Sequence, residues 1–349
     1  MGSRTTIRDV AEWAGVSNAT VSNVINDKGK VSESTRKEVL EAIEALNYRP
    51  NASAQRKLKS RGPKSIGLVI KEIHNPYFAD VIVGAQEKAE EEGYAIILSS
   101  SEGRRDTEGQ IVDLLVEKDV DGIIINPLLD HDADLSHLFN LKRRNVPFVL
   151  LEEVHGLKSN LVDIDNVKAA REVISYLIDL GHRDVIHFAG PEYSMHSDER
   201  IEGFQQAFFK TQQVYSEDYV VRTSGAHMED GYRTGLEYFK DRPASERPTA
   251  VTCYNDLTAI GLLRALRELD IDVPGEVSVT GFDNIRTCDY APVPLTSMGV
   301  PTKKMGRKAM EVLIRQLENS DQDEPEVVNL EAEMTVRAST APVEETVSA

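Results

Sequence analysis

The chain has 349 residues and a net charge of −18, with 40% hydrophobic and 28% charged residues. This length exceeds one ordinary core and predicts two or three domains. Two cysteines, Cys253 and Cys288, are too few for a disulfide framework or a thiolate zinc cage. No run approaches the roughly 18 apolar residues of a membrane-spanning helix, and the start MGSRTTIRDVAEW lacks an apolar signal core. We therefore expect a cytoplasmic protein that does not bind membranes.

The charge is distributed unevenly along the chain. Residues 1–64 hold 12 Lys or Arg and 7 Asp or Glu, whereas the remaining 285 residues hold 28 and 51. A basic segment attracts phosphate by releasing counterions, and an acidic body repels DNA. Contact with nucleic acid would therefore be confined to the N-terminal segment.

The first 47 residues have the pattern of three short helices. Thr6 followed by Asp9 is typical of a helix N-terminus, and the apolar residues that come next recur at spacings of three and four. Gly15 ends this helix, Ser17 caps a second one over NATVSNVIN, and Ser32 caps a third. The first two helices, joined by AGVS, predict a tight helix-turn-helix, although a plain helical bundle needs similar turns.

From Ile66 onward, apolar runs alternate with amphipathic helical segments. The runs are SIGLVI, YAIILSS, DGIIIN, VPFVLLE, DVIHFAG, VVRTS, TAVTCYN and VSVTGFDN. Continuous apolar strands separated by helices predict parallel sheets covered on both faces, and their number fits two doubly wound α/β subdomains in series. We expect the tail VVNLEAEMTVRA to form one further strand after a helix over 303–317.

The chain resembles the LacI/GalR family of bacterial transcription regulators. The runs DVAEWAGVSNATVS and VSESTRKEVLEAIEALNYRPN match the head of that family almost position for position, and shorter motifs from SIGLVI to PLTS follow in family order. The resemblance implies a DNA-binding head, a hinge helix, and a body like the bacterial sugar-binding proteins that closes on a small effector.

The expected domains follow from this resemblance and from the change in pattern. We expect a helix-turn-helix domain at 1–49, a hinge at 50–63, an effector-binding and dimerisation body at 64–342, and an acidic tail at 343–349. Within the body, the N-subdomain would comprise about 64–164 and 294–323, and the C-subdomain about 165–293 and 324–342.

The expected partners are operator DNA, a small-molecule effector and a second copy of the chain. A two-fold operator needs two heads, so we expect a homodimer. The C-terminal residues show no heptad pattern, so a tetramer held by a coiled coil is not predicted. We expect the DNA contacts to come from small or hydrogen-bonding residues of the head and from the hinge: Thr6, Ser17, Asn18, Ala19, Thr20, Ser22, Asn23, Asn26, Ser32, Thr35, Asn51, Ala54, Lys57 and Leu58.

Two positions depart from the family pattern. Asn23 stands where the family usually carries Arg, and its amide suits adenine in the major groove, unless it faces a phosphate. In the hinge run PNASAQRKLKSRG, Ala54 and Leu58 are four apart, whereas the family spaces an alanine and a leucine three apart. Either the helix starts later and Leu58 still enters the minor groove, or Lys57 takes that position and contacts phosphate.

Several polar residues of the body stand where predicted parallel strands end, which is where ligands bind in open sheets. The resemblance implies effector contacts at Tyr77, Phe78, Glu152, Arg200, Asn255 and Asp283. Other roles are open: Asp256 could cap the following helix, Glu152 and Asp283 could be loop carboxylates, Arg200 could pair with Asp198 or Glu199, and Tyr77 and Phe78 could be core.

A sugar or sugar derivative is the expected effector. A purine is the alternative, because Tyr77 and Phe78 could sandwich a ring. The segment DHDADLSH at 130–137 carries His131 and His137 but reads as a solvated loop, so no metal or cofactor is expected. No nucleophile elbow or glycine-rich phosphate loop occurs, which argues against an enzyme. The sequence thus predicts a ligand-responsive regulator, most simply a repressor, rather than a solute receptor without DNA function.

Overall fold

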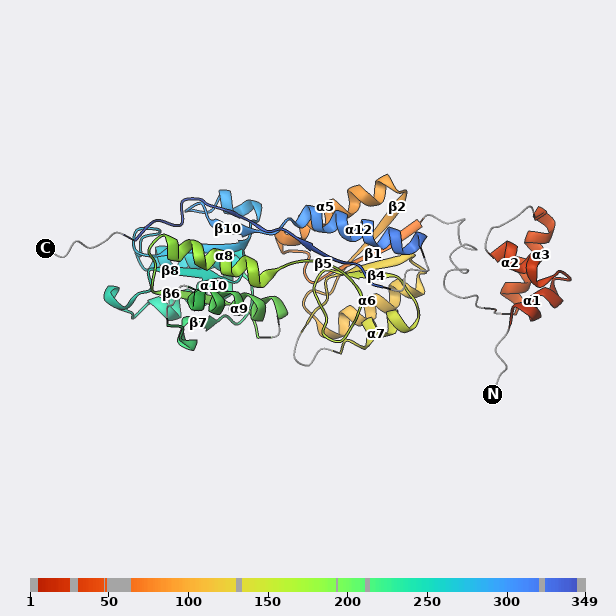
Figure 1. Ribbon diagram of the computed structural model, residues 1–349, viewed down its shortest axis with the longest axis horizontal. Helices are drawn as coiled ribbons and strands as arrows, with labels where there is room; N and C mark the ends of the chain where they lie inside the picture. The colour runs from red at the N-terminus through yellow and green to blue at the C-terminus, as the bar shows by residue number, and fades with distance from the viewer. Residues whose placement is uncertain are drawn as a thin grey trace.

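The computed structural model describes residues 6–25, 31–46, 48, 64–129, 134–192, 194–210, 214–319 and 324–343. The head, red in Figure 1, contains α1 (Ile7–Trp13), α2 (Asn18–Ile25) and α3 (Glu33–Ala45). The backbone N–H of Thr6 donates to Asp9 Oδ2 at 2.7 Å, and the hydroxyl oxygens of Ser17 and Ser32 accept from backbone N–H groups three residues later. The predicted helix starts are therefore present.

The head has a small apolar core of its own. All three helices contribute to it, through Val10, Ala11, Val21, Val24, Ile25, Val39 and Ala42. Gly15 has φ of +64° in the turn between α1 and α2, a conformation that glycine adopts without the usual side-chain clash. Trp13 lies on α1 away from this core and is 53% exposed.

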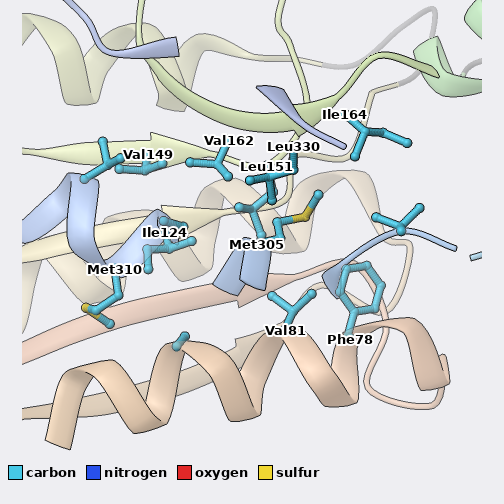
Figure 2. Close-up of a cluster of buried hydrophobic side chains, with 14 of the residues drawn as sticks. Phe78, Val81, Ile124, Val149, Leu151, Val162, Ile164, Met305, Met310 and Leu330 are labelled. Carbon is cyan, nitrogen blue, oxygen red and sulfur yellow. The ribbon is translucent and has the colours of Figure 1, made fainter. Parts of the chain in front are cut away.

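The N-subdomain is built on a parallel sheet with the order β11-β5-β4-β3-β1-β2. Its strands are β1 (Lys64–Ile70), β2 (Tyr94–Ser100), β3 (Gly122–Ile125), β4 (Phe148–Leu150), β5 (Asn160–Ile164) and β11 (Val327–Leu330). On one face α5 (Pro76–Glu91) and α12 (Thr302–Glu318) bury the core drawn in Figure 2, and on the other lie α6 (Arg105–Glu117) and α7 (Ser136–Arg143).

The C-subdomain repeats this plan with the order β12-β10-β9-β8-β6-β7. Its strands are β6 (Val185–Ala189), β7 (Val220–Arg222), β8 (Ala250–Cys253), β9 (Ser278–Asp283), β10 (Thr296–Gly299) and β12 (Glu333–Thr335), of which β12 is antiparallel. The helices α8 (Asn166–Asp179) and α9 (Met195–Lys210) pack on one face, and α10 (Met228–Phe239) and α11 (Asp256–Glu268) on the other. Short 3₁₀ helices occupy Glu217–Tyr219, Ala244–Glu246 and Arg286–Asp289.

Close contact between α5 and α12 fixes the position of the cleft-facing end of α5. A Cβ on Gly84 would lie 1.9 Å from the carbonyl oxygen of Lys303, and one on Gly306 would lie 1.9 Å from that of Val81. Glycine at both positions lets the two helices approach backbone to backbone. The hydroxyl of Tyr77, at the start of α5, donates to the sulfur of Met305 at 3.4 Å.

The structure corrects the expected division of the body. β10 pairs with β9 in the C-subdomain, although 294–323 was assigned to the N-subdomain, and β11 pairs with β5 in the N-subdomain, although 324–342 was assigned to the C-subdomain. The predicted single tail strand is therefore two short strands in different sheets. The chain crosses between the sheets after β5, after β10 and after β11, and local pattern carries no information about which sheet receives a strand.

Two further elements differ from the sequence prediction. The strand β5 was not predicted, and α9 begins at Met195, five residues before Arg200, which was expected to open that helix. Cys253 and Cys288 are free and buried, and burial raises the pKa of both thiols above its usual value. Among the described helices, none has both the length and the apolar character that crossing a membrane requires.

Candidate effector cleft and DNA-binding head

A cleft of about 560 Å³ lies where the carboxyl ends of the two sheets face each other. The strand order reverses between β1 and β3 in one sheet and between β6 and β8 in the other. Loops diverge at such switch points, which leaves room for a ligand. Tyr77, Phe78, Arg200, Asn255 and Asp283 line the cleft, so the fold brings five of the six predicted effector residues to one place.

Arg200 projects from the second turn of α9 and is 5% exposed. Its Nε donates to Asn166 at 3.2 Å, and its Nη1 donates to the carbonyl oxygen of Tyr254. The guanidinium carbon lies 3.6 Å from the ring centre of Phe282, a cation–π contact that holds its plane. Asp198, a potential partner, instead pairs with Arg222 at 2.9 Å. The Nη2 donors of Arg200 are thus directed towards the cleft.

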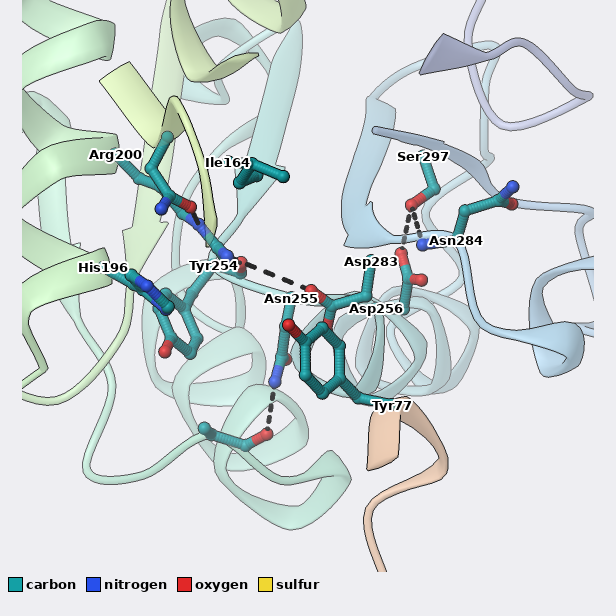
Figure 3. A network of polar contacts seen from close by, with 12 residues as sticks. Tyr77, Ile164, His196, Arg200, Tyr254, Asn255, Asp256, Asp283, Asn284 and Ser297 are labelled. Carbon is teal, nitrogen blue, oxygen red and sulfur yellow. Dashed lines mark hydrogen bonds and ion pairs between the residues drawn. The ribbon is translucent and has the colours of Figure 1, made fainter. Parts of the chain in front are cut away.

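Asp283 faces these donors from the end of β9, as Figure 3 shows. Its Oδ1 lies 3.9 Å from Nη2 of Arg200, beyond hydrogen-bond range, and its carboxyl group has no hydrogen-bond partner among the described residues. Burial raises the pKa of Asp283 far above its usual range, although the guanidinium of Arg200 opposes this shift. The backbone of Asp283 has φ of +107°, a strained conformation of the kind found at ligand sites.

Asn255 and the adjacent Asp256 are both committed to the fold. Asn255 Oδ1 accepts from the backbone N–H of Thr258 at 2.8 Å, so Asn255 caps α11, and its amide donates to the carbonyl oxygen of Ala226. The expectation that Asp256 caps this helix is wrong. Asp256 instead accepts from the backbone N–H of Ile285 and from the hydroxyl of Ser297.

Tyr77 and Phe78 do not form two parallel walls. Their ring centres are 5.1 Å apart and their planes make an angle of 85°. Phe78 is 4% exposed and packs in the core of the N-subdomain, so it only borders the cleft. A ring sandwiched between these two side chains is therefore excluded in this arrangement, and of the two only Tyr77 offers its aromatic surface to the cleft.

Glu152 lies behind the cleft lining and is 0% exposed. Its Oε2 forms an ion pair with Lys71, which does line the cleft, and its Oε1 has no hydrogen-bond partner in the described structure. Burial opposes the charged form, but His196 and Lys71 outweigh it and lower the pKa of Glu152 below its usual value. Glu152 therefore positions Lys71 rather than reaching into the cleft.

Several cleft residues were not predicted from the sequence, among them Lys71, Asn126, His196 and Tyr254. Asn126 ends DGIIIN just as Asp283 ends VSVTGFD, so the same rule would have found it. It is 4% exposed, and its side-chain amide has no partner among the described residues. The position of His196 depended on the unexpected early start of α9. Tyr254 donates to or accepts from Ser194 at 3.0 Å.

The head presents most of its predicted DNA-contacting residues at helix starts. Ser17, Asn18, Ala19 and Asn23 are exposed on or beside α2, while Thr20 and Ser22 are half-buried. Thr6 and Ser32 are exposed and Thr35 is half-buried at the starts of α1 and α3. Helix N-termini attract phosphate. Asn26 and the hinge residues Asn51, Ala54, Lys57 and Leu58 lie outside the described residues.

The segment around His137 is not a metal site in the part that the structure describes. His137 is buried and its Nε2 lies 2.9 Å from Glu108 Oε1, while residues 130–133 are outside the described ranges. No group of three His, Cys, Asp or Glu among the described residues could hold a metal ion.

Comparison with known proteins agrees with this two-part organisation. Residues 6–51 match the lacI family of bacterial regulatory proteins, and residues 174–340 match the periplasmic binding protein-like domain. The chain is 33% identical over 338 residues to the HTH-type transcriptional repressor PurR of Vibrio parahaemolyticus, covering 95% of this chain and 97% of that protein.

Solved structures extend the likeness to both parts. The transcriptional regulator CelR in its cellobiose complex shares 29% identity with a TM-score of 0.70, over 96% of this chain and 100% of that one. The Lac repressor dimer bound to operator and the anti-inducer ONPF shares 25% identity with a TM-score of 0.69, over 97% and 100%. The chain therefore belongs to the LacI family of bacterial regulatory proteins and is a DNA-binding transcriptional repressor, not an enzyme.

Proposed function

We propose that this repressor binds its operator as a homodimer under the control of a small molecule held in the cleft between the two subdomains. One observation carries the proposal. Arg200 directs its Nη2 donors, and Asp283 its carboxyl group, into the same cavity. The two groups are almost fully buried and 3.9 Å apart, too far for a hydrogen bond between them. Buried polar groups without partners are costly, so their presence at a cavity wall favours a ligand that completes them.

The effector is a small ring compound with both donors and acceptors. Arg200 requires acceptors, the Asp283 carboxylate requires donors, and the amide of Asn126 can supply either. Tyr77 offers one aromatic surface against which a ring can pack. Among ring compounds, the relationship to repressors named PurR over nearly the full length favours a purine. A ring carbonyl would face Arg200, and a ring N–H would face Asp283.

A sugar is the second candidate, and the similarity to the CelR–cellobiose complex favours it. Sugar hydroxyl groups donate and accept at once, so they also satisfy a guanidinium and a carboxylate. The two classes differ in what they need from Tyr77: a purine needs a stacking face, whereas a sugar needs only an edge or an apolar patch.

Thermal denaturation with a panel of hypoxanthine, guanine, adenine, cellobiose, glucose and ribose tests this proposal, because a ligand that binds only the folded state raises the melting temperature. We expect one class to stabilise the full-length protein and to lose that effect in Asp283→Ala. Asp241→Ala, which changes an exposed aspartate of the C-subdomain, is the matched control for loss of a carboxyl group. A ligand whose effect survives unchanged in Asp283→Ala would place its site elsewhere.

The DNA-binding part of the proposal has separate tests. Removing residues 1–60 should abolish operator binding while the body still binds its effector, because DNA contact is confined to the basic head. Selection from random DNA should recover two half-sites about one helical turn apart, in line with a two-fold dimer. If Asn23 reads a base, Asn23→Ala should relax the preference at one position of each half-site. Retention of specific DNA by the truncated body would refute the two-part division.

A further inference from the structure

A chain of buried charged groups crosses from one subdomain to the other directly beneath the cleft. His196, at the start of α9 in the C-subdomain, places its Nε2 3.1 Å from Asp163 Oδ2 on β5 of the N-subdomain. Its Nδ1 lies 3.9 Å from Glu152 Oε2, also of the N-subdomain. Both carboxylates are buried, and the His196 side chain is 13% exposed. The imidazole ring of His196 thus lies between two carboxylates that belong to the opposite subdomain.

The contact lies where movement of one subdomain relative to the other would open or close the cleft. Asp163 stands one residue before the end of β5, where the chain first crosses between the sheets. Arg200 follows His196 by one helical turn on α9, so any movement that separates His196 from Asp163 also moves Arg200 away from the N-subdomain wall. A further ion pair across the cleft among the described residues, His227 with Glu72 at 3.4 Å, involves a histidine that is 52% exposed. Exposed pairs contribute little, whereas buried ones depend strongly on both charges.

We propose that His196 is a positioning residue that couples closure of the cleft to its own protonation. With the imidazolium present, both its nitrogens donate towards N-subdomain carboxylates and hold the closed arrangement. When the ring loses a proton, one of its nitrogens can no longer donate a hydrogen bond, and the two buried carboxylates face a neutral ring. The subdomains then separate, and the carboxylates become hydrated again. The protein therefore closes at low pH and opens as pH rises.

The surrounding charges support the closed form with a protonated histidine. Burial opposes the charged ring, but Glu152 and Asp163 outweigh it and raise the pKa of His196 above its usual value. The contribution of the contact is therefore present below the pKa of a free histidine and is lost as pH rises through the higher pKa of the closed form. The charged or titratable groups that face His196 are Glu152, Asp163, Glu199, Arg200 and Asp283, with Lys71 behind Glu152.

Glu199 shifts the pH range over which the cleft opens. It lies on α9 beside His196, and burial raises its pKa to about 7, although the nearby imidazolium opposes the shift. Its Oε2 is buried without a hydrogen-bond partner in the described structure. As Glu199 ionises, its negative charge favours the imidazolium, which extends the closed form to higher pH. Glu199→Gln should therefore shift the opening transition to lower pH.

The test measures opening directly, without effector. Gln110→Cys on α6 and Glu237→Cys on α10 place exposed spin-labelling sites on the two subdomains, while the native Cys253 and Cys288 are buried and stay unlabelled. The labelled full-length chain is mixed with an excess of unlabelled chain, so that the distances arise within one protomer. Electron–electron double resonance measures the distance between the two labels at about pH 6 and at about pH 9, which lie on either side of the range in which histidine titrates.

For the parent chain we expect the short distance to dominate at low pH and the long distance to grow at high pH. Each unit by which the pKa of His196 differs between closed and open forms changes the closed-to-open ratio tenfold. His196→Gln and Asp163→Asn should both show the high-pH distribution at both pH values. The matched control His155→Gln removes an exposed histidine and should behave as the parent chain. Far-UV circular dichroism of each variant checks that it is folded.

Two results would overturn the proposal: the same distances at both pH values in the parent chain, or a pH response that persists in His196→Gln. A parallel effect on effector affinity rests on the proposed function, and isothermal titration with hypoxanthine and cellobiose measures it. Because the distances are recorded without ligand, failure of both compounds to bind would count against the proposed function and leave the distance result to decide the role of His196.

Discussion

The two walls of the cleft come from subdomains with the same sheet plan, but their polar side chains are paired differently. On the C-subdomain wall, Arg200 and Asp283 keep donors and a carboxyl group unmatched, 3.9 Å apart. On the N-subdomain wall, Lys71 is already paired with the buried Glu152. The first wall is arranged to be completed by a ligand. The second is internally neutralised, which suits it to carry the contacts that control closure.

Position at a strand end therefore does not by itself decide whether a residue contacts a ligand. Glu152 lies two residues after β4 and Asp283 is the last residue of β9, and both were predicted to touch the effector. Only Asp283 reaches the cavity, because Lys71 covers Glu152. Substitutions on one wall at a time should therefore have different effects on the two sides of the cleft.

The largest effect is expected on the N-subdomain wall. Lys71→Met leaves the buried Glu152 with an uncompensated charge, and the free energy of unfolding should fall by about 2–3 kcal/mol. This is below the roughly 3–5 kcal/mol usual for breaking a buried pair, because the Lys71 side chain is 22% exposed and His196 remains beside Glu152. Chemical denaturation measures the change. The double variant Lys71→Met/Glu152→Gln should be more stable than the single one, and equal stability would show that the charge is not the cause.

On the C-subdomain wall, Arg200→Ala should act on binding. We expect the effector identified by thermal denaturation to bind more weakly by about 1.5–3 kcal/mol, the usual range for a hydrogen bond to a charged group. Isothermal titration calorimetry measures the affinity, and operator affinity without effector should stay near that of the parent chain. Arg233→Ala is the control for an exposed arginine of the same subdomain. Unchanged effector affinity in Arg200→Ala would remove this residue from the site.

Asp283 should make the stability of the unliganded protein depend on pH. Its folded-state pKa lies above the unfolded value of 3.8, so the folded state binds the proton more tightly and stability falls as pH rises from the unfolded to the folded pKa. Asp283→Asn removes this loss. The free energy of unfolding of the variant minus that of the parent chain should therefore be larger at about pH 9 than at about pH 5, by on the order of 1–2 kcal/mol. Denaturation curves at both pH values test it. A parallel pH profile in the parent chain and the variant would contradict the buried, unpaired carboxyl group.

The smallest effect is expected at Asn126, the unmatched amide of the N-subdomain wall. Asn126→Ala should weaken effector binding by about 1 kcal/mol, the contribution of one neutral hydrogen bond. Asn329→Ala, on an exposed part of β11, is the matched control. If the first variant behaved as the second in titration calorimetry, the N-subdomain wall would contribute closure contacts without recognition.

Elements whose signals are local could be predicted from the amino-acid sequence. Capping residues and apolar spacing located α1, α2 and α3, and continuous apolar runs located most strands, because a helix start or a buried strand is set by neighbours within a few residues. The rule that ligands bind at strand ends placed Arg200 and Asp283 at one cavity, and it would have found Asn126 as well. The resemblance to a family supplied the function of the head.

Tertiary structure alone decided what depends on contacts between distant segments. The three crossings between the sheets assign β10 and β11 to subdomains opposite to those expected, since hydrogen bonding to β9 and β5 is invisible in the strands' own residues. The burial of Glu152 depends on Lys71, which is 81 residues away in the chain. The contact between His196 and Asp163 exists only where two subdomains meet. Charge pairing and hydrogen-bond geometry act across space at a few ångströms, and only the folded chain sets those distances.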